Sequence, residues 1–251
     1  MPTIGYMPSS RGSLRTLIGC QNCALHRFCL PAYLDEAETA RLEGIIKRNC
    51  PLHKGDHLFR AGDAMQHIFA LRSGALKTYL LDKDGTEQIT GFVLPGELVG
   101  LDAFGSSTSP SYAMALETSL ACTIPLTELE ELAGCMPHLR KQLLDSLSRE
   151  LHVEQEHLTH SRECAEQRLS SFLLNLSARF SRRGLSAAKF ILPMSRGEIG
   201  NYLGLTTETI SRLFTRYRQQ GLIELDGREI ELIRLRSWLN ELRSEPAGAH
   251  R

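Results

Sequence analysis

Three cysteines lie close together near the start of the chain: Cys20, Cys23 and Cys29, in the stretch Cys-Gln-Asn-Cys-Ala-Leu-His-Arg-Phe-Cys. Thiols this close in sequence form a metal site, a redox-active pair or a disulfide. The segment is too short to have a core of its own, so other parts of the chain must hold it. The spacing alone does not choose among these kinds of chemistry.

The composition narrows the choice. The chain has 251 residues, a length typical of two domains. Of these, 42% are hydrophobic and 23% charged, as expected for a globular protein. It has no run of eighteen apolar residues and no secretory signal pattern at its start, so we expect a cytoplasmic protein with no membrane partner. In a reducing compartment, clustered cysteines more often bind metal or act catalytically than form disulfides, and the odd total of seven also disfavours a disulfide framework.

The charge is unevenly distributed along the chain. The net charge is zero, but residues 166–251 contain 14 Lys/Arg and 9 Asp/Glu, whereas the remainder contains 15 and 20. A basic final third next to an acidic remainder indicates that only the C-terminal region meets a polyanion.

The middle of the chain predicts a β-structure. Asp35 and Glu38 form a capping box that starts a helix, and from about residue 50 to 124 short apolar runs alternate with glycines. Turn signals at Ser73-Gly74 and Asp84-Gly85 separate these runs, which predicts a compact antiparallel roll. Thr127, with Glu130 three residues later, predicts the start of a short helix after the roll.

A long helix is predicted from Pro137 to about Ala165. Its leucines recur at the three-, four- and seven-residue spacing of a coiled-coil seam: Leu144, Leu147, Leu151 and Leu158. We expect this seam to pair with a second copy of the chain. Glu154 interrupts the seam, and two such carboxylates facing each other would weaken the dimer, unless the side chain turns to solvent.

The last region predicts a DNA-reading unit. Ser195 and Glu198 form a capping box for one helix, Gly204 ends it, and Thr206 caps a second helix to about Gln220, which together make a helix-turn-helix. Residues 222–233, with Asp226-Gly227 at their centre, predict a two-stranded wing with a type I′ turn. The residues expected to face DNA bases are Thr207, Glu208, Ser211 and Arg212, and those expected at phosphates are Arg196, Arg216 and Arg218.

With these features together, the chain resembles the FNR family of oxygen-sensing transcription regulators in the CRP/FNR superfamily. The resemblance covers nearly the whole chain and rests on the cysteine cluster, a single Cys122 at the end of the roll, the long helix, and Glu208-Thr-Ile-Ser-Arg212. It implies an α+β fold: an antiparallel β-roll like that of cyclic-nucleotide-binding domains, a dimerisation helix and a winged helix-turn-helix. We accordingly divide the chain into a cysteine-rich segment (1–30), a roll (31–136), a dimerisation helix (137–165) and a DNA-binding domain (166–251).

The resemblance also implies the site residues. Cys20, Cys23, Cys29 and Cys122 would bind an oxygen-labile 4Fe-4S cluster, which would favour a homodimer on TTGAT-type inverted repeats in double-stranded DNA and so control anaerobic gene expression. Turns at Ser73, Gly74, Asp84 and Gly85 occupy positions where family members contact RNA polymerase. The resemblance implies no enzymatic activity. Four thiolates also suit zinc, so a structural zinc protein and a dithiol enzyme are the competing hypotheses.

A cyclic nucleotide is not expected as a ligand. A nucleotide site in this superfamily needs an Arg-Ser or Arg-Thr after a Gly-Glu turn, to bind the cyclic phosphate. Residues 109–115 contain no arginine, and Gly100 is followed by Leu101 rather than Glu. A phosphate without a cationic partner would be costly to bury.

Overall fold

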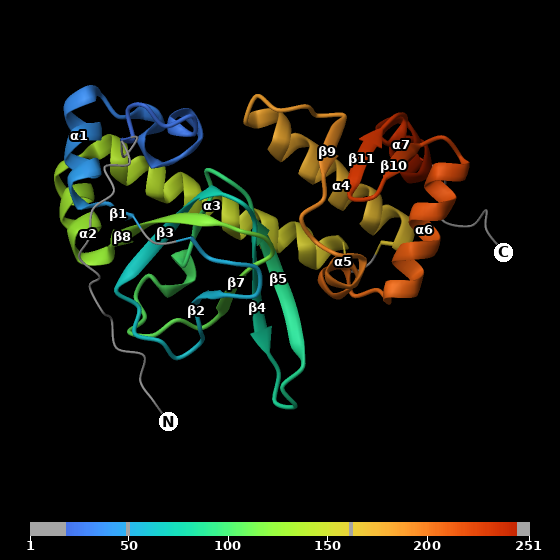
Figure 1. Cartoon of the computed structure of the whole chain (residues 1–251), viewed down its shortest axis with the longest axis horizontal. Coiled ribbons are helices and arrows are strands. Elements are labelled where there is room, and N and C mark those ends of the chain that lie inside the picture. The colour runs from blue at the N-terminus through green and yellow to red at the C-terminus, as the bar shows by residue number, and fades with distance from the viewer. Residues whose placement is uncertain (1–18, 49–50, 161–162, 245–251) are drawn as a thin grey trace.

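The structure is a computed structural model that describes residues 19–48, 51–160 and 163–244 (Figure 1). The first described segment, which contains the three clustered cysteines, has two short 3-10 helices, η1 (His26–Phe28) and η2 (Leu30–Tyr33). Helix α1 (Glu36–Ile45) follows, and it begins with the predicted capping box: the Asp35 side chain accepts from the Glu38 amide, and Glu38 accepts from the Asp35 amide.

Two antiparallel four-stranded sheets make up the predicted roll, with orders β1-β8-β3-β6 and β2-β7-β4-β5. The strands of the first are β1 (Lys47–Arg48), β8 (Leu120–Pro125), β3 (His67–Ser73) and β6 (Leu98–Val99), with the short helix η3 (Leu101–Ala103) after β6. Those of the second are β2 (His57–Phe59), β7 (Tyr112–Ala115), β4 (Leu76–Leu81) and β5 (Glu87–Val93).

The roll has an apolar core between its sheets and further apolar faces outside them. Phe69 and Leu71 of β3 point into the inner core with Leu76 and Val93, whereas Ile68 and Ala70 belong to an outer cluster with η2, α1 and the helices after the roll. This alternation follows from the two-residue period of a strand. Strand β3 is therefore buried on both of its faces.

The helices after the roll differ from the prediction at two points. Helix α2 (Leu126–Cys135) begins after Pro125, two residues earlier than a cap at Thr127 implies. No side chain caps it, so the predicted capping box does not form. Helix α3 (Pro137–His160) is the predicted long helix, but residues 163–164 are not helical. Cys164 is extended and caps the next helix, α4 (Ala165–Arg182), so a single helix does not run to Ala165.

The C-terminal unit contains the predicted helix-turn-helix, formed by α5 (Arg196–Leu203) and α6 (Thr207–Gln219). Three strands, β9 (Lys189–Ile191), β10 (Ile223–Asp226) and β11 (Glu229–Leu232), form a sheet in the order β10-β11-β9, and α7 (Leu235–Ser244) follows. The wing therefore has one strand more than predicted.

The wing turn is not of type I′. That type needs a positive φ at both central residues, here Gly227 and Arg228. Gly227 has φ of 58°, but none of the described non-glycine residues has a positive φ. The fold otherwise confirms the expected α+β class of roll, long helix and winged helix-turn-helix. None of the helices in the described ranges is long and apolar enough to cross a membrane.

Candidate functional site

The four cysteines singled out from the sequence line one pocket. Cys20, Cys23 and Cys29 come from the segment before α1, and Cys122 comes from β8, on the face of the roll that this segment covers. Leu25, Leu30, Ile46 and Ile124 are among the residues that make the rest of the lining largely apolar. The structure thus joins a thiol distant in sequence to the clustered three.

Successive backbone hydrogen bonds fold the cysteine segment into tight turns. The Cys23 amide donates to the Cys20 carbonyl at 3.2 Å, and the His26 amide donates to the Cys23 carbonyl at 2.9 Å. The His26 ring also lies 3.0 Å from the Cys20 carbonyl through Nδ1. These short-range bonds point three thiols in one direction without any regular secondary structure beyond η1 and η2.

The pocket disfavours the thiolate form of Cys29 unless a cation is present. Burial raises the pKa of the Cys29 thiol to about 12; the Leu30 amide opposes this, and the neighbouring thiols of Cys122, Cys20 and Cys23 add to it. A thiol with this pKa is protonated at neutral pH. Coordination to a metal deprotonates a thiol and removes the penalty, so the donor set fits a cationic metal group.

The donor set suits more than one kind of metal group. Structural zinc takes four ligands around one ion, whereas a 4Fe-4S cluster is bound by four cysteine thiolates. In the described ranges, no three His, Cys, Asp or Glu side chains are grouped as they would be around a single metal ion. Four thiols in one pocket are a donor set for either group.

The second candidate site is the exposed face of α6. Its start is capped by Thr206, whose side-chain oxygen accepts from the Thr209 amide at 3.1 Å. The buried side of the helix contains Ile210, Leu213, Phe214 and Tyr217, as predicted. Its other side leaves the predicted base-facing residues exposed: Thr207, Glu208, Ser211 and Arg212.

Two of the predicted base-facing residues pair with each other. Glu208 and Arg212 form an ion pair one helical turn apart, although their side chains are 71% and 75% exposed. An exposed pair of this kind contributes only about 0.3–0.5 kcal/mol, so DNA can separate it at little cost. Ser211 donates its hydroxyl to the Thr207 carbonyl at 2.8 Å.

The predicted phosphate-binding arginines differ in their surroundings. Arg216 pairs with Glu166 at the start of α4. Arg196 stacks on the Phe214 ring, 3.3 Å from its centroid, and burial lowers the pKa of its guanidinium to about 10. Its Nη1 atom is buried with no hydrogen-bond partner among the described residues. Arg196 therefore supports α6 from beneath, and contact with a phosphate stays a prediction for both arginines.

The predicted dimer seam lies on α3. Leu144 and Leu151 are 60% and 65% exposed, as a seam without its partner would be, and Glu154 is exposed beside them. Leu147 packs partly against the core formed by α2, α3 and the cysteine-covered sheet. Leu158 lies within α3, but its side chain is outside the described part of the structure.

The turns predicted to contact polymerase do not lie together. Ser73 and Gly74 precede β4, whereas Asp84 and Gly85 are in the turn that follows it. The strand β4 therefore separates the two turns, and their role stays a prediction.

The Gly-Glu turn is present, but at Gly96-Glu97 rather than at Gly100. Gly96 has φ of 89°, and the Glu97 carboxylate accepts from the Leu94 amide at 2.9 Å. The same carboxylate binds two arginines of the C-terminal unit, Arg179 and Arg183, which sequence reasoning missed. Their spacing of four residues, on one side of an amphipathic helix, is the signal that could have identified them.

Residues 109–115, which contain no arginine, lie next to an acidic residue, Asp102. Ser111 donates its hydroxyl to Asp102 Oδ2 at 2.6 Å. The expectation that this roll binds no cyclic nucleotide stays a prediction.

Comparisons with known proteins give separate matches to the roll and to the C-terminal unit from α4 to α7, which we call the reader. The profile of the family described as "Cyclic nucleotide-binding domain" matches residues 50–134, and that of the "Crp-like helix-turn-helix domain" matches residues 167–241. Among solved structures, FixK2 from Bradyrhizobium japonicum has a TM-score of 0.71 and 29% identity, covering 81% of this chain and 100% of that one. A CooA mutant from Carboxydothermus hydrogenoformans shares the fold at a TM-score of 0.65, with 18% identity over 80% of this chain and 89% of its own. The fold and the reader helix thus define a DNA-binding transcription regulator, and not an enzyme.

Curated relatives identify the family. The chain is 50% identical over 215 residues to "Transcriptional activator protein FnrA" of Stutzerimonas stutzeri, which covers 85% of this chain and 88% of that protein. It is 48% identical over 216 residues to "Fumarate and nitrate reduction regulatory protein" of Escherichia coli (strain K12), covering 86% of each. The chain belongs to the FNR family of the CRP/FNR superfamily.

Proposed function

We propose that this protein is an oxygen-responsive transcription regulator that acts in the cytoplasm on genes of anaerobic metabolism. The observation that carries the proposal is the single pocket in which Cys20, Cys23, Cys29 and Cys122 lie together. The names of the relatives, which refer to fumarate and nitrate reduction, support the anaerobic role.

In this proposal the four thiolates hold a 4Fe-4S cluster. When bound, the cluster would supply an oxygen-labile link between the N-terminal segment and the roll. The chain's own residues then do two things. The turns from Cys20 to Cys29 present three ligands from one side, and Cys122 presents the fourth from a strand of the roll. The apolar lining of Leu25, Leu30 and Ile124 limits the access of water.

Dimerisation and DNA binding are assigned to the C-terminal half of the chain. We propose that α3 pairs with α3 of a second copy through Leu144, Leu151 and Leu158, with Leu147 at the edge of the seam, and that Glu154 weakens this pairing. The dimer would place two α6 helices on an inverted repeat of TTGAT-type half-sites, with Glu208, Ser211 and Arg212 at bases. A single chain would bind weakly, because one half-site offers too few contacts.

Further contacts complete the proposal. Thr207 would lie beside the bases, and Arg196 and Arg216 would contribute positive charge near phosphates. The turns at Ser73-Gly74 and Asp84-Gly85 would contact RNA polymerase at promoters.

The test starts from protein purified without oxygen. We expect brown protein with iron and sulfide, whose visible absorption bleaches in air, together with tight binding to an inverted repeat that weakens after exposure to air. Cys135→Ser provides a matched control, because Cys135 is exposed on α2, outside the pocket, and this variant should keep its iron. A colourless zinc protein that binds DNA equally with and without air would contradict the proposal and favour the structural-zinc hypothesis.

A further inference from the structure

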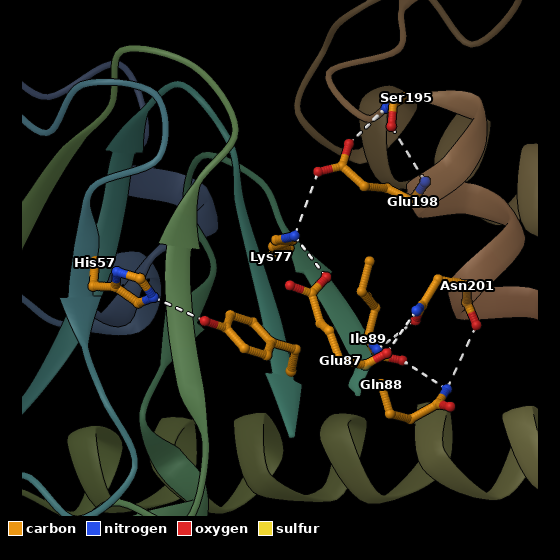
Figure 2. A network of polar contacts seen from close by, with 9 residues as sticks. His57, Lys77, Glu87, Gln88, Ile89, Ser195, Glu198 and Asn201 are labelled. Carbon is orange, nitrogen blue, oxygen red and sulfur yellow. Dashed lines mark hydrogen bonds and ion pairs between the residues drawn. The ribbon is translucent and has the colours of Figure 1, made fainter. Parts of the chain in front are cut away.

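Strand β5 lies at the edge of its sheet, and its free side meets the reader. The sheet order β2-β7-β4-β5 leaves one side of β5 without a neighbouring strand. Backbone groups on such an edge need partners when another part of the protein covers them. Figure 2 shows that helix α5 approaches this edge and that Asn201 is the residue that supplies the partners.

The Asn201 side chain pairs with β5 as a peptide group of another strand would. Its Oδ1 accepts from the Ile89 amide, and its Nδ2 donates to the Glu87 carbonyl, both at 2.7 Å. Only one orientation of the amide satisfies a donor and an acceptor at the same time. Two well-formed bonds therefore hold α5 at one position along the strand, although 112 and 114 residues separate the partners.

A buried lysine adds a second set of contacts to the same joint. Lys77, with only 9% of its side chain exposed, places Nζ 2.6 Å from Glu87 Oε1 and 3.6 Å from Glu198 Oε1. Glu198 also accepts from the Ser195 amide at 2.8 Å, completing the capping box of α5 (Figure 2). One carboxylate thus serves both the start of the helix and its contact with the roll.

Apolar packing and a charge cluster flank the amide. Phe92 of β5 lies edge-on to Tyr202 of α5, with ring centroids 5.3 Å apart. On α4, Arg179 donates through Nε to Glu97 at 2.9 Å. We call three sets of contacts, together with this packing, the roll–reader joint: those of Asn201 with β5, of Lys77 on β4 with Glu87 on β5, and of Lys77 with Glu198 on α5.

The joint leaves the DNA-reading face uncovered. Glu208 and Arg212 on α6 are 71% and 75% exposed, so contact with the roll does not mask them. Helices α5 and α6 are closely packed, because a Cβ on Gly200 would lie 3.5 Å from the Ile210 side chain of α6 and only 2.6 Å from the Leu205 carbonyl oxygen in the turn between the helices. An element that fixes α5 therefore fixes α6 as well. The joint orients the reading face instead of blocking it.

We propose that Asn201 is a positioning residue for DNA recognition: it fixes the reader on its own roll and so sets the separation of the two α6 helices in a dimer. This inference rests on the proposed function, because separation has meaning only for a dimer on an inverted repeat. Helix α5 would then determine which separation of the two half-sites the dimer prefers, while Arg212 and its neighbours on α6 contact the bases.

The test uses cluster-loaded, full-length protein without oxygen. Binding is measured to an inverted repeat with the preferred spacing and to repeats with one base pair added or removed. We expect the wild-type protein to bind the repeat with one spacing more tightly than the others. In Asn201→Ala this ratio of affinities should fall about tenfold, the factor expected from the loss of two hydrogen bonds of ordinary net strength. The preference for the correct half-site sequence over a changed one should stay.

Gln88→Ala is the matched control, because Gln88 is exposed on the same strand and reaches the Asn201 carbonyl only at 3.5 Å. It should keep the wild-type spacing preference. Asn201→Asp keeps an acceptor for the Ile89 amide but turns a carboxylate oxygen towards the Glu87 carbonyl, so it should lose at least as much of the preference as Asn201→Ala and serves as a second variant if Asn201→Ala folds poorly. Hydrogen exchange at the Ile89 amide reports the joint without DNA and should be faster in Asn201→Ala.

Two outcomes would overturn the inference. Faster Ile89 exchange with an unchanged spacing preference would give the joint a structural role alone, and tighter binding by Asn201→Ala at the preferred spacing would mean that the joint inhibits. A wild-type protein that does not prefer an inverted repeat to one half-site would instead contradict the proposed function, and the Ile89 exchange rates would still report whether Asn201 forms the joint.

Discussion

The two sheets of the roll hold the two ends of the chain by different means. On the sheet β1-β8-β3-β6, the cysteine segment rests on short turns and places three thiols next to one strand residue, Cys122. On the sheet β2-β7-β4-β5, the reader shares a continuous apolar core with the roll and adds buried ion pairs and the Asn201 amide. Lysine and arginine side chains form ion pairs on the sheet that meets the reader, and the four thiols of the proposed ligand set lie on the other sheet.

This difference indicates which contact is suited to change. Segments with few buried contacts and local hydrogen bonds open at low free energy, whereas a core with paired charges opens only with the whole domain. We infer that the contact between the cysteine segment and the roll can open, whereas the contact between the reader and the roll keeps the reader in a fixed position.

Cys122→Ala should abolish iron binding, because three thiolates from one short segment cannot replace the ligand supplied by the roll. Iron content and visible absorption of protein purified without oxygen measure the effect. The urea unfolding of iron-free protein should change little, since the thiol is only partly buried. A Cys122→Ala variant with full iron content would show that the four cysteines of the pocket are not the ligands. The contrast between the two sheets would then no longer hold.

Glu97→Gln should lower the free energy of unfolding at pH 7 by about 2–3 kcal/mol, slightly below the range for breaking a buried pair, because Glu97 is 30% exposed. Burial opposes ionisation of Glu97, but Arg179 and Arg183 lower its pKa to about 2 from the usual 4.5. The stabilisation is therefore present above about pH 4.5 and is lost as the pH falls towards 2.

Urea unfolding at pH 7 and at pH 3 measures this loss, and the difference between wild type and Glu97→Gln should shrink at the lower pH. Glu117→Gln is the control, because the Glu117–Arg228 pair spans 3.5 Å between exposed side chains. Equal effects of the two substitutions would mean that the reader side is held no more firmly than any surface contact.

Arg212→Ala should reduce discrimination at one guanine by about 1–3 kcal/mol and leave the other positions of the site unchanged. Arg218→Ala, at an exposed position of the same helix, should weaken binding to all sequences and lower the salt dependence by about one charge. Binding to a set of single-base variants measures both. A uniform loss with Arg212→Ala would assign this residue to the phosphates as well.

Glu154→Ala should strengthen dimerisation in air by only a few-fold, because exposed like charges contribute about 0.2–1 kcal/mol. Sedimentation of aerobically purified protein measures the change. Glu130→Ala on α2 removes the same charge away from the seam and should leave the profile unchanged. An identical profile for all three proteins would exclude Glu154 from the control of dimerisation.

The sequence predicted those features that depend on neighbouring residues. The capping boxes at Asp35 and Ser195 and the cap at Thr206 form as expected, because each needs only a side chain and an amide two or three residues away. The amphipathic pattern of α6 likewise identified its buried and exposed faces. The grouping of Cys122 with the other cysteines came from resemblance to a family and not from spacing.

The features that the sequence did not predict depend on long-range contacts. Asn201 resembles any polar helix residue until β5 is placed beside it, and Glu97 gives no sign of the arginines that it binds more than 80 residues later. The stop in the long helix before Cys164 was also missed, since no proline or glycine between Leu158 and Ala165 marks it. Arg196 was expected at a phosphate because nothing local indicates its stacking on Phe214.

The position of Cys122 within its sheet has a consequence for reuse of the protein. Strand β8 lies between β1 and β3, and Cys122 pairs in register with Arg48 on one side and Ala70 on the other. In the proposed ligand set, Cys122 stays fixed in its sheet, while Cys20, Cys23 and Cys29 all belong to one short segment. After loss of the cluster, rebuilding the site would require only that this segment bind again to the intact face of the roll. The same molecule could then take up a new cluster without unfolding.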